Sequence, residues 1–425
     1  MTYYTKNVYE IKRNVAAFLK PIINGHSLNE QRFIADMFQG ILEGKSLIVS
    51  DIARHLKNGK NVRTNFKRLD RHLKTFDVHK KMISQYHQTI APILGDEKIF
   101  LVDDSDIIKP YGNVFEDLGR VRDGSKDRGR TFEKGYHVAQ IVGLSKKTYQ
   151  PIPIAHQIYS EKEREFQSSN YHTLDNILTT LDAFRADDAD AKCLFVCDRG
   201  YDDGKLFKCF VHAHAQFLIR VQSNRKYIID NKKYALDELY DKYKGIYKYE
   251  IEFQGDYFKR DVKISTVEVE TLDPQLPKLT LLLIYGIGEK PMALLTNKLS
   301  IDKDIAIHLF KCYFLRWRIE EYFRATKQKY GFENMRVQTL KRMNTLSWFL
   351  QLCMGYQAYF IETQRQNALF EKMRCIAQAY KDNVSIWIYQ ITDALATTFL
   401  MARTNLHEVL DLTRTPRDRW QLSLF

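Results

Sequence analysis

The sequence predicts a mixed α/β protein in which helical segments flank a β-sheet unit and a β-rich block interrupts that unit. Three patterns support this class. Apolar residues recur at helical spacing through residues 1–95, short apolar runs alternate with helical segments through 96–225, and strand-like alternation occupies 226–298. Helical spacing returns in 299–365 and continues in 366–425. We therefore expect 96–225 and 299–365 to form one α/β unit, with further helical parts at both ends of the chain.

The composition indicates a globular protein with a polyanionic partner. Of the 425 residues, 44% are hydrophobic and 28% are charged, which is near the globular average and argues against a disordered chain or a fibre. Lys and Arg total 65 against 52 Asp and Glu, which gives a net charge of +13. An excess of this size favours nucleic acid or an anionic membrane as the partner.

The sequence does not support the membrane alternative. No apolar run reaches the roughly 18–20 residues that a spanning helix needs, and residues 1–15 lack the apolar segment of a signal peptide. The six cysteines form no Cys-x-x-Cys pair and the 12 histidines show no metal-ligand spacing, so we expect reduced thiols and no structural zinc site. These features favour a cytoplasmic protein that binds nucleic acid and no membrane.

A strongly basic stretch lies in the N-terminal helical part. Phe66, Leu69 and Leu73 recur at i, i+3 and i+7, which is one face of a helix. Lys and Arg occupy eight positions between 54 and 74, against a single acidic residue. We predict that this part is a helical DNA-binding domain, with a solvated helix face as the alternative. The predicted DNA contacts are Arg63, Lys67, Arg68 and Arg71.

Two apolar runs of strand length each end in an aspartate. Ile99–Val102 precedes Asp103, and Cys193–Cys197 precedes Asp198. The elements here follow the order strand, strand, strand, helix, strand, helix, strand, with the first three strands in a meander. Carboxylates at the ends of neighbouring strands can share a divalent cation, since Mg²⁺ prefers oxygen ligands. Either aspartate alone is also a common turn residue, so each is weak evidence by itself.

A basic, glycine-containing segment follows the first of these strands. Its basic residues are Arg120, Arg122, Lys126, Arg128, Arg130 and Lys134. We predict a loop that contacts DNA through Arg120, Arg122 and Lys126, and a solvated loop is the alternative.

The β-rich block and the helices after it complete the pattern. The expected strands are 247–253, 262–264, 267–269, 279–285 and 292–295. A long helix is expected from Asp302 to about Tyr330, and a strongly apolar one from about Leu340 to Thr363.

The first of these helices carries a polar stripe. Tyr313, Arg316, Glu320 and Lys327 fall within about 60° of one another when each residue turns the helix by about 100°. An acid flanked by two cations and a phenol suits a metal ion beside a nucleic-acid backbone. An ordinary i, i+4 Arg–Glu pair on the surface remains the alternative.

The spacing Tyr313-x2-Arg316-x3-Glu320-x6-Lys327 resembles the signature of the IS-four group of insertion-sequence transposases. These are cut-and-paste DDE transposases with an RNase H-like catalytic core. Asp103-Asp104-Ser105 and Asp198-Arg199-Gly200 resemble the two aspartate motifs of the family, and 226–298 resembles the β domain that many relatives insert into the core. The resemblance therefore implies an RNase H-like core with an inserted β domain.

The resemblance also implies an activity. Asp103, Asp198 and Glu320 would hold two Mg²⁺ or Mn²⁺ ions, cleave transposon-end DNA by hydrolysis and join the 3′-OH ends to target DNA. The residues implied to contact this double-stranded DNA are Tyr313, Arg316, Lys327 and Arg199. A homodimer that joins two DNA ends in the bacterial nucleoid is implied as well.

Two questions stay open at this point. Strand alternation places Asp103 and Asp104 on opposite faces, so only one of them can be the ligand, and we assign Asp103. The alternatives to a transposase are an RNase H-like nuclease or resolvase without strand transfer, and a non-catalytic DNA-binding derivative.

Overall fold

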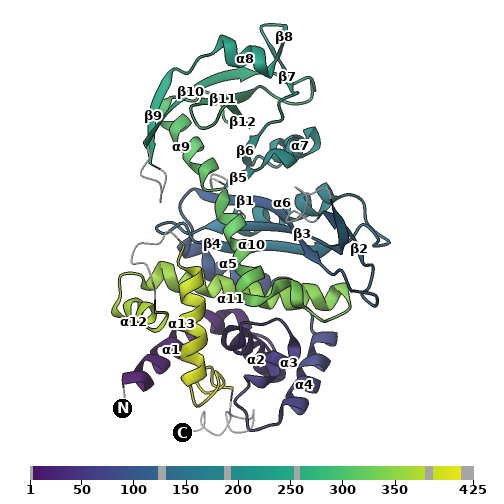
Figure 1. The fold of residues 1–425 in the computed structure, drawn as a ribbon, viewed down its shortest axis with the longest axis vertical. Coiled ribbons are helices and arrows are strands. Elements are labelled where there is room, and N and C mark those ends of the chain that lie inside the picture. Colours follow the sequence, from purple (N-terminus) through teal and green to yellow (C-terminus); the bar gives the residue numbers. More distant parts are fainter. Residues whose placement is uncertain (1–2, 123–130, 186–192, 253–258, 379–385, 413–425) are drawn as a thin grey trace.

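The chain is elongated and has three tiers along its long axis (Figure 1). A computed structural model describes residues 3–122, 131–185, 193–252, 259–378 and 386–412. A helical tier at one end contains both described chain ends, a sheet with covering helices forms the middle, and further strands form the other end. None of the helices in these ranges is long and apolar enough to cross a membrane.

The middle tier contains the predicted strand order. Its first three long strands form an antiparallel meander, β1 (Lys98–Ile108), β3 (Phe132–Leu144) and β4 (Pro151–Tyr159). Helices α6 (Ser169–Arg185) and α7 (Gly204–His212) then alternate with β5 (Cys193–Cys197) and β6 (Gln216–Arg220). Strand β5 is parallel to both β1 and β6. The predicted order of the α/β unit is therefore confirmed, apart from one additional short strand, β2 (Gly119–Arg122), between β1 and β3.

Strand β1 is longer than the sequence pattern predicts. Its parallel pairing with β5 ends at the pair Val102–Cys197, where the apolar runs end. Beyond this pair β1 continues to Ile108 against β3 alone. Asp103 therefore lies inside a strand, and the prediction that the strand ends before it is wrong. The polar half escaped detection because it lacks the buried apolar face on which strand patterns depend.

The basic segment after β1 is also partly strand. Arg120 and Arg122 belong to β2 (Gly119–Arg122), which pairs antiparallel with the start of β3. Their prediction as loop residues is wrong, since pairing with β3 draws them into the sheet. Lys126 lies outside the described residues.

The strands of the β-rich block extend the same sheet. These are β9 (Tyr247–Glu252), β10 (Lys259–Val269), β11 (Leu279–Tyr285) and β12 (Met292–Thr296). Strand β12 pairs antiparallel with β6, and the described strands follow the order β2-β3-β1-β5-β6-β12-β11-β10-β9, with β4 on the far side of β3. A separate hairpin of β7 (Lys226–Ile229) and β8 (Lys232–Ala235) precedes helix α8 (Leu236–Lys242).

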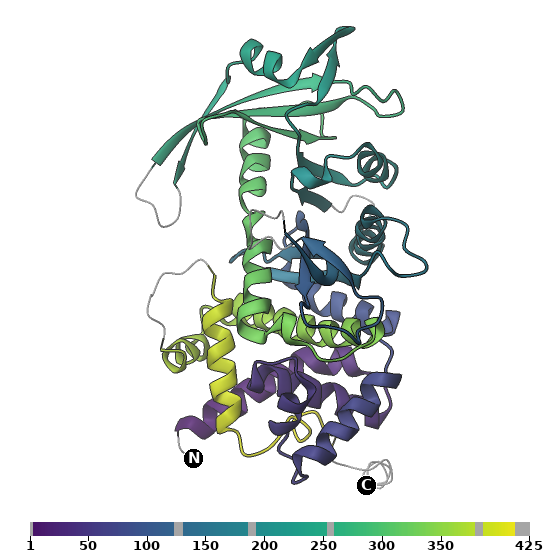
Figure 2. The same ribbon diagram turned by 45° about the vertical axis from the view of Figure 1, so that its right-hand side comes forward.

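The predicted long helix is divided in two. Helices α9 (Lys303–Phe314) and α10 (Trp317–Tyr330) follow one another from the far tier into the middle (Figure 2). At the division, the backbone N–H groups of Arg316 and Ile319 bond to carbonyls three residues earlier rather than four, at 3.0 and 3.1 Å. This tighter winding places Tyr313 on α9 and the other three stripe residues at or after the division.

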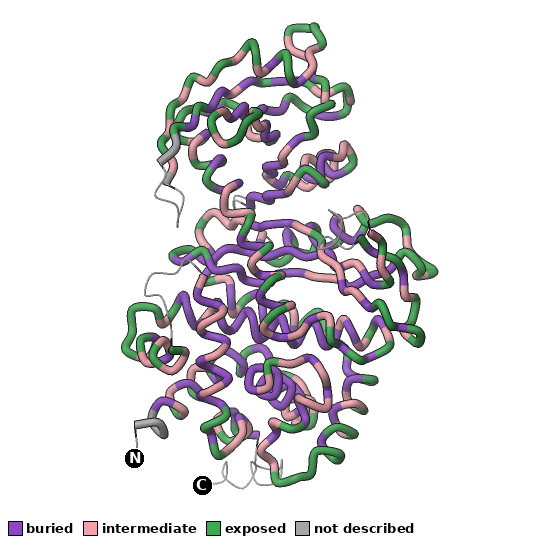
Figure 3. The backbone as a smooth tube through the Cα atoms, in the orientation of Figure 1, coloured by how far each residue is buried: buried purple, intermediate pink, exposed green. Residues whose placement is uncertain are grey.

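Helix α11 (Leu340–Gln364) joins the sheet to the helical tier. It is buried on all sides along most of its length, which fits its strongly apolar sequence (Figure 3). It contacts β4 on one side and α2 and α13 on the other. The other helices, with the short 3₁₀ turns, are α1 (Tyr3–Ile23), α2 (Leu28–Gly44), α3 (Val49–Arg54), α4 (Val62–Thr75), α5 (Lys80–Ile90), η1 (Ala91–Ile93), η3 (Arg199–Tyr201), η4 (Phe332–Asn334), α12 (Ala368–Ile376) and α13 (Ile388–Met401).

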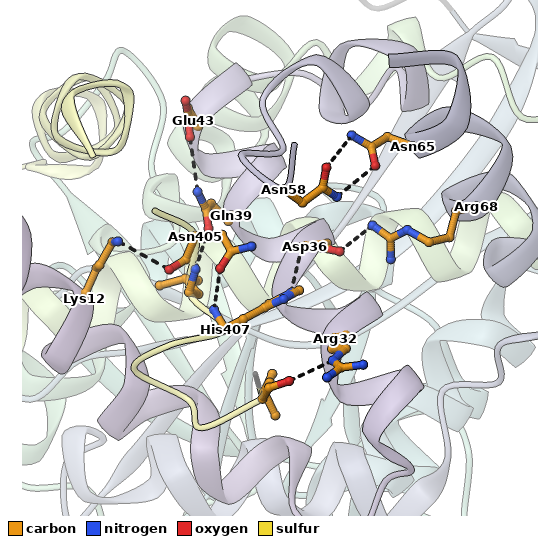
Figure 4. A network of polar contacts seen from close by, with 12 residues as sticks. Lys12, Arg32, Asp36, Gln39, Glu43, Asn58, Asn65, Arg68, Asn405 and His407 are labelled. Carbon is orange, nitrogen blue, oxygen red and sulfur yellow. Dashed lines mark hydrogen bonds and ion pairs between the residues drawn. The ribbon is translucent and has the colours of Figure 1, made fainter. Parts of the chain in front are cut away.

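Polar residues on α2 bind both the basic helix and the C-terminal segment (Figure 4). The buried carboxylate of Asp36 forms an ion pair with Arg68 of α4 and lies 2.9 Å from Nε2 of His407. The side-chain oxygen of Gln39 accepts a bond from the Leu406 N–H at 2.8 Å, and Arg32 donates to the Leu412 carbonyl at 2.8 Å. Arg68 is thus held inside the tier.

We expect replacement of Asp36 by Ala to lower the free energy of unfolding by about 2–3 kcal/mol. The change leaves Arg68 and His407 partly buried without their carboxylate, and partial solvent access keeps the loss below that of a fully buried pair. Denaturant unfolding followed by circular dichroism measures the effect.

The matched control is Asp51→Ala. Asp51 pairs with Arg54, whose side chain is 60% exposed, so its loss should cost less than about 1 kcal/mol. Equal losses for the two variants would contradict the role assigned to Asp36.

Candidate active site

Two aspartates follow the last parallel pair between β1 and β5. Val102 and Cys197 form that pair, so Asp103 is the next residue of β1 and Asp198 is the first residue after β5. The Asp103 side chain is 24% exposed. Burial is the main cause that raises the pKa of Asp103 to about 7, and the charges of Asp104 and Asp198 add to this while Arg316 opposes it. The aspartates are therefore close enough to repel each other.

The guanidinium of Arg316 connects the acidic residues. Its Nη1 donates to Asp103 Oδ2 at 3.2 Å, and its Nη2 donates to Glu320 Oε1 at 2.6 Å. Burial lowers the pKa of Arg316, but Asp198, Asp103 and Glu320 together outweigh this, so its pKa is raised. Arg316 is therefore bonded to two of the three acidic residues predicted as catalytic, and the charge of the third, Asp198, also raises its pKa.

The neighbouring Asp104 points elsewhere. It lines a cavity of about 790 Å³ on the β2–β3 side of β1, together with Arg120, Arg122 and Phe132. The contact with Arg316 is made by Asp103. The geometry thus groups Asp103, rather than Asp104, with Glu320.

The other two stripe residues lie on either side of this group. Tyr313 is buried at the end of α9, and its pKa is raised chiefly by burial and then by Asp198, with Arg220 opposing. Lys327 lies further along α10, where its Nζ is 3.0 Å from Asp106 of β1 and 3.3 Å from Glu333. Arg220, Asp106 and Glu333 had no role in the sequence prediction, because no local spacing connects them to the stripe.

Oxygen donors of this kind suit a hard divalent cation. The electrostatic repulsion between Asp103 and Asp198 is also a reason for a cation to bind between them. The Asp103, Asp198 and Glu320 oxygens do not all lie within 4.8 Å of one another, however, whereas Glu97, His308 and Cys312 in the described part of the chain do bring their donor atoms that close. The acidic residues fit a cation in charge and donor type, with Arg316 now bonded to two of them.

The other exposed residues predicted to contact DNA are in three places. Arg63, Lys67 and Arg71 are exposed on α4 at the edge of the helical tier, on a different face from their buried neighbours. Arg199 is exposed immediately after Asp198. Arg120 and Arg122 are exposed on β2 beside the cavity that Asp104 lines. The α4 residues are therefore not gathered with the acidic group.

An exposed aromatic ring lies between the two β2 arginines. Phe132 is 50% exposed, and the guanidinium carbons of Arg120 and Arg122 lie 5.9 and 5.8 Å from the centre of its ring. The pairing of Arg122 with Phe132 across the hairpin brings these groups together. Phe132 was not predicted as a site residue, since a loop was expected here; the signal that could have found it is an apolar ring among basic residues.

Comparisons with known proteins add a family to this geometry. No curated protein sequence matches the chain. Among solved structures, the Drosophila P element transposase strand transfer complex matches with 9% identity over 88% of this chain and 86% of that chain. The TM-score of this match is 0.21, which is below the level that indicates a shared fold. The family model described as the transposase DDE domain matches residues 96–355, a range that contains Asp103, Asp198 and Glu320. The chain therefore belongs to the transposase DDE domain family.

Proposed function

We propose that this protein is a metal-dependent DNA transposase that cleaves transposon-end DNA and joins the freed 3′-OH ends to target DNA. The observation that carries the proposal is the arrangement around Arg316, which contacts Asp103 and Glu320 and is influenced by the charge of Asp198. All of these residues lie within the family match. The meander followed by two parallel strands supports an RNase H-like core.

The proposed ligands are Asp103, Asp198 and Glu320. Two Mg²⁺ or Mn²⁺ ions bound there would supply an activated water or 3′-OH and stabilise the leaving oxygen. Arg316 balances the acidic charges in the free protein and would give up at least one of its contacts when cations take that role. Its freed guanidinium is then placed to bind a DNA phosphate, as are Tyr313 and Lys327 beside it.

The remaining contacts would guide DNA toward these residues. Arg199 is exposed next to Asp198, and Arg120 and Arg122 are exposed beside the cavity that Asp104 lines. Phe132 offers a ring there on which an unpaired base can stack. Helix α4 would bind duplex phosphates further out through Arg63, Lys67 and Arg71, and Lys126 stays a predicted contact. Arg68 is better explained by its ion pair with Asp36.

The wider organisation follows the same proposal. Residues 1–95 would form the DNA-binding domain, 96–225 with 299–365 the catalytic core, 226–298 the inserted β domain and 366–425 a helical C-terminal segment. The four-residue helix signature supports membership of the IS-four group. A homodimer would hold two transposon ends together in the bacterial nucleoid.

We expect Asp198→Asn to reduce DNA cleavage and strand transfer at least about 1,000-fold, because loss of a metal ligand removes several kcal/mol of transition-state stabilisation. DNA binding in the absence of metal should persist. The measurement uses labelled duplexes that carry the inverted repeats flanking the gene, incubated with target DNA and Mg²⁺.

Asp104→Asn is the control and should retain activity. Equal losses in the two variants would contradict the choice of Asp103 over Asp104. Unchanged cleavage by Asp198→Asn would refute the metal site. Nicks without joined products in the wild type would instead favour a nuclease or resolvase, and binding without cleavage a non-catalytic derivative.

We expect Lys67→Gln to weaken duplex DNA binding without changing stability. The neighbouring Arg68→Gln should lower stability without changing duplex DNA binding. Lys67 is exposed, so its loss should lower the slope of log affinity against log salt by about 1. Arg68 holds Asp36, so its loss should lower the melting temperature. Fluorescence anisotropy over a salt series and thermal unfolding separate the two; a reversed pattern would contradict the assignment of α4.

We expect Phe132→Ala to weaken binding of single-stranded DNA by about 1–3 kcal/mol, the usual contribution of one stacked base. Stacking involves no counterion release, so Phe132→Ala should leave the slope of log affinity against log salt unchanged. Arg122→Ala should lower that slope by about 1, which corresponds to the loss of one phosphate contact.

Tyr9→Ala provides a matched control. Tyr9 is a similarly exposed ring with the Arg13 guanidinium 5.8 Å from its centre, but it lies on α1 in the helical tier. If Tyr9→Ala and Phe132→Ala weaken binding equally, the ring of Phe132 has no special role.

A further inference from the structure

Three potential metal ligands of different chemistry meet at the junction of β1 and α9. Glu97 directly precedes β1, while His308 and Cys312 both belong to α9. One donor atom from each residue lies within 4.8 Å of the other two. The Cys312 thiol is buried and the His308 side chain is 48% exposed, so the group has a protein side and a solvent side. None of the three belongs to the candidate active site.

The four-residue spacing of His308 and Cys312 on α9 lets both side chains bind one ion. Positions i and i+4 lie on one helix face, so His308 and Cys312 present their side chains to the same point. The Nε2 atom of His308 lies 3.5 Å from Cys312 Sγ and also contacts the Glu97 carboxylate. In a tetrahedral zinc site with bonds of about 2.0–2.3 Å, two ligand atoms are roughly 3.3–3.8 Å apart. The His–Cys separation matches this spacing, and the His–Glu contact would widen to admit the ion.

We propose that Glu97, His308 and Cys312 form a zinc site. Thiolate and imidazole ligands select Zn²⁺, whereas the oxygen-only group of Asp103, Asp198 and Glu320 suits Mg²⁺ or Mn²⁺. The two sites therefore differ in the metals that they accept. Water completes the tetrahedron on the exposed side of His308, since three protein ligands leave one position open.

The ion would connect two segments that carry candidate active-site residues. Glu97 begins the segment that continues through β1 to Asp103, and α9 leads through Tyr313 to Arg316. A bond from each segment to one ion fixes the start of β1 against α9. The zinc ligands then stabilise the arrangement of these segments without touching the reacting DNA.

Zinc titration of the purified full chain tests the site, with a chromophoric chelator as competitor and Mg²⁺ in excess. We expect one zinc per chain, and Co²⁺ in its place should give a thiolate-to-cobalt charge-transfer band. Cys312→Ser and His308→Gln should each weaken binding at least about tenfold, because even partners of metal ligands contribute about 10–100-fold. The charge-transfer band should vanish in Cys312→Ser.

Cys375→Ser is the matched control, because Cys375 is an exposed thiol outside the cluster that could bind zinc adventitiously. It should bind zinc as the wild type does. Thermal unfolding with EDTA checks that each variant folds, and added zinc should raise the melting temperature of the wild type and of Cys375→Ser only. No stoichiometric binding, or equal binding by Cys312→Ser and the wild type, would overturn the proposal. The outcome is separate from that of the cleavage assays, since no DNA is used.

Discussion

The balance of charge around Arg316 is the constraint on which the centre of the molecule depends. Parallel pairing of β1 and β5 places Asp103 beside Asp198, and the negative charge of Asp198 raises the pKa of Asp103. Two neighbouring carboxylates repel each other unless a cation lies nearby. Arg316 supplies that charge from the division between α9 and α10. The path of these two helices from the far tier into the middle is therefore tied to the chemistry of the sheet.

Much of the fold could be predicted because buried elements have clear local patterns. The apolar runs of β5 and β6, and the helix α11, are close to their expected positions. The errors occur where side chains meet solvent or distant partners: the polar half of β1, strand β2, and the division before α10. No distinctive local sequence marks a polar strand that forms only because it pairs with a neighbouring strand. The same is true of a helix that winds more tightly beside an ion pair.

The acidic residues of the candidate site and Arg316 were predicted, while the partners of Lys327 were not. Asp103 and Arg316 are 213 residues apart, so a strand pattern and a helix spacing could name each of them but could not join them. The same reason explains why the ion pair of Arg68 was not predicted, since Asp36 lies 32 residues away on another helix. His308 and Cys312 did have helical spacing, but their third partner, Glu97, is 211 residues from His308.

Helix α11 has a consequence for the order in which the chain folds. The early helices α1 and α2 bury their apolar faces against α11 and α13, which leave the ribosome much later. Until α11 arrives, these faces remain exposed and α4 lacks its contact with that helix. An incomplete chain therefore leaves these apolar faces without their partners, and we expect nascent fragments to need protection from aggregation.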